Sequence, residues 1–206
     1  MTINVEFLFD FGSPNAYLSH LVIPRIEART GVLFRYVPVL LGGVFKATNN
    51  VSPAVSLQGI KNKPEYTQLE TTRFLKQHNI TAYARNPFFP VNTLTIMRGA
   101  VFAQGTPYFK KYVDAVYRHM WAEPKKMDEQ GVIQAALTES GLPAAEILAG
   151  TQEARVKQQL IANTDSAVAH GVFGSPSFLV GKELFFGKDR LRDVEEEIEL
   201  QKRNAR

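Results

Sequence analysis

The stretch FLFDFGSPNAYLSH, residues 7–20, decides the fold of this chain. Residues 3–9 are rich in β-forming side chains and stop shortly before Gly12, which predicts a buried strand. Ser13 then has the side chain of a helix N-cap, and Pro14 suits the first helical position. Thiol redox proteins often place a cysteine at such a strand-to-helix turn, yet this chain contains no cysteine. The turn therefore has the form of a redox turn without its sulfur.

The helix predicted after this turn continues to Gly31, a residue typical of a helix end. Its apolar residues recur at helical spacing, at Tyr17, Leu18, Leu21 and Val22. Residues 32–41 again favour a strand, so the chain begins as β-α-β. Two strands joined by a helical crossover are expected to be parallel.

The middle of the chain, residues 43–165, has helical apolar patterns and no clear strand. The end returns to β structure, with strands 177–180 and 183–186 on either side of a two-residue turn that begins with Gly181. A final amphipathic helix follows. We therefore predict an α/β fold of order β-α-β…β-β-α with a large all-helical insertion. Residues 1–42 and 166–206 form the discontinuous main domain, and residues 43–165 form the insertion.

The composition excludes several classes of site. The 206 residues are 45% hydrophobic and 21% charged, which is ordinary for a folded globular protein. The absence of cysteine excludes disulfides, thiolate metal sites and a protein-thiol nucleophile. The four histidines are scattered along the chain, so we expect no metal site. There is no signal peptide pattern and no long apolar run, so we expect no membrane association and a cytoplasmic location.

The charge pattern does not favour nucleic acid. The formal net charge is +4, but the Lys and Arg residues are dispersed and match no nucleic-acid-binding motif. A mild positive charge suits small anionic ligands. The sequence also lacks the P-loop, the G-x-G-x-x-G loop, the G-x-S-x-G turn and the H-E-x-x-H zinc motif.

Two interpretations of the Ser13 turn are open at this point. Ser13 is an N-cap, which by itself explains a Ser-Pro pair. The same helix N-terminus favours an anion through its free N–H groups and its dipole. A serine hydroxyl does not ionise near neutral pH without a base, but it can donate a hydrogen bond to a thiolate that a ligand brings. Asp10, beside the turn, is either a turn former or a buried acid.

A second pattern, GVFGSPSF at residues 171–178, leads into the strand that follows the helical insertion. A helix-opening turn after the first strand, combined with G-x-P-x-F before a later strand, is the layout of thioredoxin-like folds. In that layout the residue before a cis-proline lies opposite the helix N-terminus. The sequence leaves open whether the bond before Pro176 is cis.

The chain resembles the 2-hydroxychromene-2-carboxylate isomerases and the related kappa-class glutathione transferases, in the DsbA-like branch of the thioredoxin superfamily. The matching pieces span nearly the whole chain, in family order. They are FDFGSPNAYL (9–18), PVLLGGVFKATNN (38–50), NPFFPVNT (86–93), GVFGSPSF (171–178) and FFGKDRL (185–191). The resemblance implies a thioredoxin-like (DsbA-like) domain with a helical insertion, as the sequence pattern also predicts.

The resemblance also implies site residues and a cofactor, glutathione. Ser13 matches the serine that contacts the glutathione sulfur, and Ser175 matches the residue whose backbone pairs with the cysteinyl part. The loop at the last helix matches the part that holds the γ-glutamyl end, and consists of Phe186, Gly187, Lys188 and Asp189. The Asp189 carboxylate suits an α-ammonium group, or is simply an acid at a helix N-terminus. Lys46 and Asn50 match positions near the substrate or glutathione, and Lys46 is otherwise an ordinary exposed lysine.

The function implied by the resemblance is glutathione-dependent isomerisation of a small unsaturated or aromatic oxo-acid, of the 2-hydroxychromene-2-carboxylate kind. A kappa-like glutathione transferase, which consumes glutathione, is the first alternative. The second is a cysteine-less thioredoxin-like binding module. The resemblance further implies a homodimer.

Overall fold

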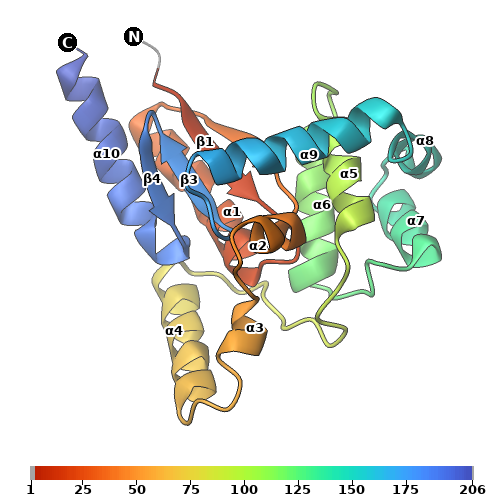
Figure 1. The fold of residues 1–206 in the computed structure, drawn as a ribbon, viewed down its shortest axis with the longest axis horizontal. Helices are drawn as coiled ribbons and strands as arrows, with labels where there is room; N and C mark the ends of the chain where they lie inside the picture. The colour runs from red at the N-terminus through yellow and green to blue at the C-terminus, as the bar shows by residue number, and fades with distance from the viewer. Residues whose placement is uncertain (1–2, 206) are drawn as a thin grey trace.

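Residues 3–205 are described by a computed structural model, and their strands form one four-stranded sheet (Figure 1). The strand order is β2-β1-β3-β4, with β1 at Val5–Phe9, β2 at Phe34–Pro38, β3 at Ser177–Val180 and β4 at Glu183–Phe186. β1 and β2 are parallel, whereas β3 is antiparallel to both β1 and β4. The predicted order of strands along the chain and the parallel first pair are confirmed.

The central strand β1 supplies the core on both faces of the sheet. Phe7 lies opposite Tyr36 and Phe178 in the register of the neighbouring strands. Its ring stacks on Phe178 with centroids 5.4 Å apart and meets the Tyr36 ring edge-on at 5.0 Å. The next residue, Leu8, points to the opposite face, as the two-residue period of a strand requires. There it joins a smaller apolar cluster, which contains Val37, Val39, Val44, Ala167, Val172 and Leu179.

Helices cover both faces of the sheet and extend beyond one edge of it (Figure 1). α1 and α10 pack together on the Phe7 side, and α2 and α9 pack together on the Leu8 side. The helices α5 to α8 form a group beside the sheet. The bounds are α1 Pro14–Thr30, α2 Leu41–Ala47, α3 Pro53–Ser56, α4 Lys63–Gln77, α5 Leu94–Ala103, α6 Phe109–Trp121, α7 Gln130–Glu139, α8 Ala144–Gly150, α9 Ala154–Ala169, η1 (a 3-10 turn) Lys188–Arg190 and α10 Leu191–Asn204.

The first helix begins and ends where its sequence predicts. Ser13 caps α1, and its side chain accepts a hydrogen bond from the Ala16 N–H. Gly31 ends the helix in the left-handed conformation, with φ of 70°. The Gly31 N–H donates to the Glu27 carbonyl at 2.8 Å, so a carbonyl of the last turn has a partner.

The second strand is shorter than predicted, and α2 is a helix that the sequence analysis missed. β2 ends at Pro38 and α2 begins at Leu41, where the sequence still reads as a strand followed by Gly42-Gly43. Tertiary contacts explain the difference. The Leu41 N–H donates to the Asp10 carboxylate at 2.7 Å, and the Leu40 N–H donates to the Thr164 hydroxyl at 3.0 Å. Both acceptors come from distant segments, which the local sequence cannot indicate.

The division into a main domain and an insertion at residues 43–165 stays a prediction. The strands lie within residues 5–38 and 177–186, and the structure between them is helices and loops. Both predicted boundaries fall inside helices, in α2 and α9, and these two helices pack against each other.

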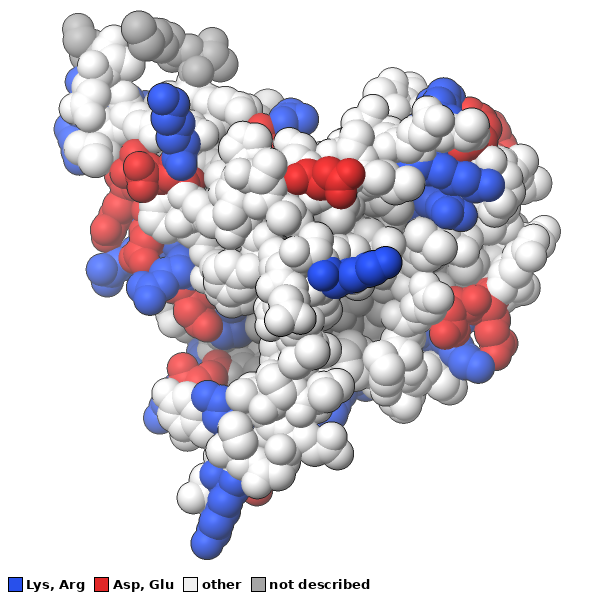
Figure 2. All heavy atoms as spheres, in the orientation of Figure 1, with Lys and Arg blue, Asp and Glu red and all other residues white. Residues whose placement is uncertain are grey.

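Charged residues of both signs are mixed around the margin of the face in Figure 2, and few lie in its middle. This view agrees with the dispersed charge pattern of the sequence. None of the helices described between residues 3 and 205 combines the length and the apolar character needed to cross a bilayer.

The packing of α5 on α6 requires a glycine at position 99. A Cβ atom there would lie 2.1 Å from the Tyr112 hydroxyl oxygen, which is itself held by a hydrogen bond to the Ile96 carbonyl at 2.7 Å. We expect Gly99→Ala to lower the free energy of unfolding by about 1–3 kcal/mol, because the helices must separate. Gly131→Ala is the matched control. The site in α7 is open, so this change should raise stability by up to about 1 kcal/mol. Urea unfolding of both variants gives the comparison, and equal stabilities would contradict it.

Candidate functional site

The predicted site residues gather at one edge of the sheet, where β1, β2 and β4 end and β3 begins. Ser13 follows β1, and α2, which carries Lys46, follows β2. Ser175 precedes β3, and Gly187 follows β4. Because β3 is antiparallel to its neighbours, its beginning lies beside their ends. The topology therefore brings four separate segments to one edge.

Ser13 is buried at this edge of the sheet, with 5% of its surface exposed. Its hydroxyl oxygen accepts a hydrogen bond from the Ala16 N–H at 3.2 Å. The hydroxyl also donates to the Ser175 carbonyl at 2.8 Å. A hydroxyl has one hydrogen to donate. It must therefore rotate away from Ser175 to donate to a ligand at the N-terminus of α1.

Ser175 lies opposite this helix N-terminus, and the Ser175–Pro176 peptide bond is cis. The structure thus answers the question that the sequence left open. The Ser175 hydroxyl oxygen accepts a hydrogen bond from the Asp10 N–H at 3.1 Å. The Ser175 loop is therefore bound to the first turn twice, through Ser13 and through the backbone of Asp10.

The loop after β4 packs against the same segment. The half-exposed rings of Phe186 and Phe173 lie with centroids 4.5 Å apart. A Cβ atom at Gly174 would lie 2.7 Å from the Phe186 ring, so this contact depends on the glycine. The Gly187 N–H donates to the Pro176 carbonyl at 2.9 Å. Phe186 and Gly187 therefore lie beside Ser175. The Phe173 ring lies with them, although the sequence analysis did not select it.

Lys188 and Asp189 differ in exposure. Lys188 is buried, with its ammonium 4.7 Å from the centre of the Phe74 ring in α4. The same ammonium lies 2.5 Å from the Asp189 carboxylate, whose side chain is 69% exposed. Lys188 thus connects α4 to the η1 turn and faces away from solvent. The exposed Asp189 carboxylate remains accessible to a ligand.

The two predicted residues from the α2 region also differ. Lys46 lies exposed in the last turn of α2. The Asn50 side chain donates to the Phe173 carbonyl at 3.0 Å and accepts from the Val51 N–H at 2.8 Å. Both ends of this carboxamide are bonded to backbone, so Asn50 holds two loops together. A direct contact from Asn50 to a ligand stays a prediction.

Asp10, which the sequence analysis left as either a turn former or a buried acid, and Thr93, which it did not select, both lie beside the Ser13 turn. The Asp10 side chain is 1% exposed and belongs to the turn that ends at Ser13. Burial raises the pKa of Asp10, and hydrogen bonds from Gly12, Leu41 and Thr93 act in the opposite direction. The local part was predictable, since an Asp often bonds to the N–H two residues ahead. The bonds from Leu41 and Thr93 depend on the tertiary fold.

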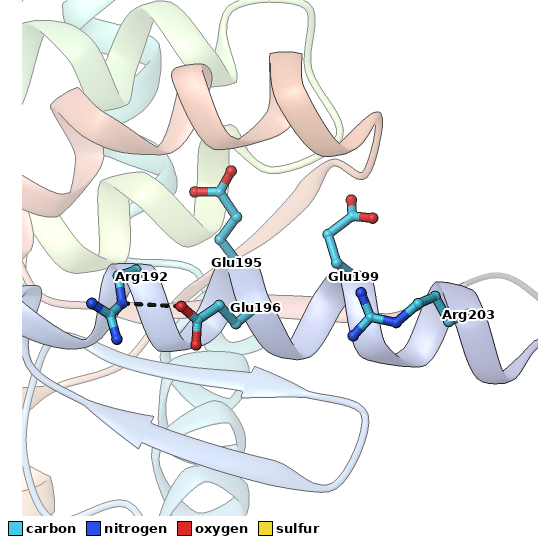
Figure 3. Close-up of a pocket in the computed structure, with 5 residues that line it drawn as sticks. All are labelled: Arg192, Glu195, Glu196, Glu199 and Arg203. Atoms are coloured by element: carbon cyan, nitrogen blue, oxygen red, sulfur yellow. Dashed lines mark ion pairs between the residues drawn. The ribbon is translucent and has the colours of Figure 1, made fainter.

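Two hollows in the surface lie away from Ser13. The groove along α10, of about 520 Å³, is lined by Arg192, Glu195, Glu196, Glu199 and Arg203 (Figure 3). Its glutamates already pair, since Glu196 lies 3.0 Å from Arg192, Glu195 lies 2.6 Å from Arg29 in α1 and Glu199 lies 2.7 Å from Lys202. A second hollow, of about 470 Å³, includes residues of α5, α7 and α8. Neither contains a predicted site residue.

Comparisons with known proteins agree with this architecture. The sequence profile of the DSBA-like thioredoxin domain matches residues 4–199. The chain is 26% identical over 195 residues to a 2-hydroxychromene-2-carboxylate isomerase of Sphingobium xenophagum, covering 95% of this chain and 97% of that protein. It is 24% identical over 200 residues to glutathione S-transferase kappa 1 of Rattus norvegicus, covering 91% of this chain and 87% of that protein.

Among solved structures, one of a 2-hydroxychromene-2-carboxylate isomerase superposes with a TM-score of 0.83 at 24% identity. The superposition covers 98% of this chain and 97% of that chain, which shows a shared fold. The predicted thioredoxin-like, DsbA-like fold and the predicted resemblance are both confirmed.

The two hydrogen bonds of the Ser13 side chain stabilise the fold without any ligand. We expect Ser13→Ala to lower the free energy of unfolding by about 1–2 kcal/mol, because the Ala16 N–H loses its cap. Ser52→Ala is the control, since Ser52 caps the short helix α3 with a bond of 3.3 Å from Ala54. That change should cost no more than about 0.5 kcal/mol. Thermal and urea unfolding give both values, and an unaltered Ser13→Ala stability would argue against the cap.

Proposed function

Because the chain belongs to the DsbA-like thioredoxin family, we propose that it is a glutathione-dependent isomerase of unsaturated oxo-acids. The observation that carries the proposal is the Ser13 hydroxyl at the N-terminus of α1, opposite the Ser175-Pro176 loop, in a chain without cysteine. The name of the isomerase relative supports the reaction class, and the name of the transferase relative supports the use of glutathione. The substrate class is taken from the isomerase relatives.

The residues of the first turn fit an incoming thiol. A free thiol has a pKa of about 8.5 and is mostly protonated at neutral pH. Lowering that pKa by about two units requires roughly 2.7 kcal/mol of preference for the thiolate. A helix N-terminus contributes about 0.3–1 kcal/mol to a nearby anion. A hydrogen bond to a charged group contributes about 1.5–3 kcal/mol. The stabilisation of a thiolate by the N-terminus of α1 and the Ser13 hydroxyl together is of the magnitude that this pKa shift requires.

The other residues at this edge of the sheet would bind and orient glutathione and the substrate. The Ser175 backbone suits the cysteinyl part of glutathione, and the exposed Asp189 carboxylate suits its α-ammonium group. The Lys46 ammonium, exposed in the last turn of α2, would attract a substrate carboxylate. Glutathione at this site would supply a thiolate that adds reversibly to the substrate double bond, allows rotation about the resulting single bond, and leaves. The Ser13 hydroxyl stabilises the negative charge on sulfur before addition and after release.

The role of Ser13 predicts a change in the thiol pKa of bound glutathione. Ser13→Ala should raise that pKa by about one unit, which corresponds to the loss of about 1.4 kcal/mol of thiolate stabilisation. The thiolate absorbance of bound glutathione, followed in a pH titration, measures the change. Ser52→Ala, a serine at a different helix end, should leave the pKa unaltered. The same titration curve for wild type and Ser13→Ala would exclude the proposed contact.

A kappa-like glutathione transferase is the first alternative, supported by the match to the rat enzyme. An isomerase should convert 2-hydroxychromene-2-carboxylate to its open-chain isomer with no loss of free glutathione. A transferase should instead form a stable thioether with 1-chloro-2,4-dinitrobenzene and consume glutathione in equal amount. Following substrate absorbance and free thiol in the same reaction separates the two. Thioether formation without isomerisation would reject the isomerase proposal.

The remaining alternative is a cysteine-less thioredoxin-like binding module. Calorimetry with reduced glutathione addresses it directly. Failure of glutathione to bind, together with binding of an extended peptide, would favour that function over either enzyme.

A further inference from the structure

The carboxylate of Asp10 is the point where three segments of the site edge meet. Its side chain is 1% exposed, and its oxygens accept hydrogen bonds from the Gly12 N–H at 2.8 Å and from the Leu41 N–H at 2.7 Å. The Thr93 side chain, just before α5, and the Asp10 carboxylate both lie close to Gly12. The first turn and α2 are thus joined through one buried side chain, and the segment before α5 lies beside them.

The backbone of Asp10 bonds to Ser13 and Ser175, the two serines of the proposed glutathione thiol site. The Ser13 N–H donates to the Asp10 carbonyl at 3.1 Å, and the Asp10 N–H donates to the Ser175 hydroxyl at 3.1 Å. Asp10 therefore contacts both serines of the proposed thiol site through its main chain. It contacts the segment that carries Lys46 through its side chain.

The two carboxylate oxygens have different tasks. Oδ1 accepts from Gly12, two residues ahead, which is a local turn that an asparagine also forms. Oδ2 accepts from Leu41, 31 positions along the chain, at the first residue of α2. α2 has no side-chain cap of its own, so this bond and the bond from Leu40 to Thr164 fix where the helix begins. Accepting both the Gly12 and the Leu41 N–H groups takes two acceptor oxygens. A carboxylate has two, whereas a carboxamide has one.

We propose that Asp10 is a positioning residue, which sets the placement of α2, and with it Lys46, relative to Ser13. The inference rests on the proposed function in one respect, since Lys46 and Ser13 are the substrate and thiol residues of that proposal. Asp10 itself is sealed from solvent and bonded on both oxygens, so its effect on the reaction passes through α2 and the first turn.

The variant Asp10→Asn separates the two tasks. It keeps the shape of the side chain and the Oδ1 bond to Gly12, but it faces an NH₂ group toward the Leu41 N–H. In the free protein, amide hydrogen exchange over residues 40–50 should become about tenfold faster, while exchange over residues 14–20 stays within about twofold. Thr151→Val is the matched control. It removes a buried hydroxyl that donates to the Leu148 carbonyl at 2.7 Å, at the end of α8, which lies apart from α2 in Figure 1, and it should change neither segment.

Binding and activity then test the positioning role. For Asp10→Asn, the dissociation constant for glutathione should stay within about threefold of wild type, because the Ser13 turn is kept. The KM for the oxo-acid substrate should rise about tenfold, which is the effect of about one lost hydrogen bond. Faster exchange in both segments, with loss of glutathione binding, would reduce Asp10 to a general stabiliser and overturn the inference. Unaltered exchange over residues 40–50 would overturn it as well.

The hydrogen-exchange experiment needs no ligand. It therefore tests whether Asp10 positions α2 even if the protein does not have the proposed function. Absence of glutathione binding in the wild-type protein would reject the proposed function and leave the exchange result standing.

The wild-type protein also provides a test that does not depend on folding of the variant. The Leu41 amide should exchange at least about tenfold more slowly than the Gly42 amide, because the first amides of a helix are otherwise unprotected. Equal rates for these two amides would overturn the inference.

Discussion

The hydrogen bond from the Ser13 hydroxyl to the Ser175 carbonyl is the contact on which the arrangement of the site depends. It joins two residues that lie 162 positions apart, at 2.8 Å. The sheet makes this contact possible, because β1 and β3 are antiparallel neighbours and Leu8 lies opposite Ser177. The N-terminus of α1 therefore faces the loop that leads into β3. The loop after β4 joins the same segment, because the Gly187 N–H donates to the Pro176 carbonyl.

The charges near this edge are balanced in a way that leaves the helix N-terminus available. The Asp10 carboxylate is bonded to backbone N–H groups, and the Asp189 carboxylate lies beside the Lys188 ammonium. Neither acid is an uncompensated negative charge beside Ser13. The glutamates that line the groove along α10 are paired as well, Glu195 with Arg29, Glu196 with Arg192 and Glu199 with Lys202 (Figure 3).

Local features of the sequence predicted local structure well. The Ser13-Pro14 start of α1, its end at Gly31 and the turn at Gly181 each depend on neighbours within a few residues. The conformation that Gly31 and Gly181 adopt has positive φ, which glycine reaches without steric cost. The start of α2 was missed for the converse reason. Leu40 and Leu41 read as strand by their side chains, and only acceptors on Thr164 and Asp10 turn them into a helix start.

The candidate site divides in the same way. The resemblance selected Ser13, Ser175 and the 186–189 loop, and the structure brings these together at one edge. It did not indicate that the Asn50 carboxamide is bonded to backbone at both ends, or that Lys188 is buried against Phe74. Those outcomes depend on which distant groups come within hydrogen-bonding or van der Waals distance.

The sequence by itself determined the strand-turn-helix at residues 7–20, the returning hairpin and the absence of any protein thiol. Backbone dihedral preferences, helix capping and the two-residue period of strands act over short distances, so they can be read from neighbouring residues. Only the tertiary structure decided that Asp10 holds α2, that Ser175 accepts from Ser13 and that Phe173 packs on Phe186. A buried donor or acceptor takes its partner from whichever segment the packed fold places within about 3 Å.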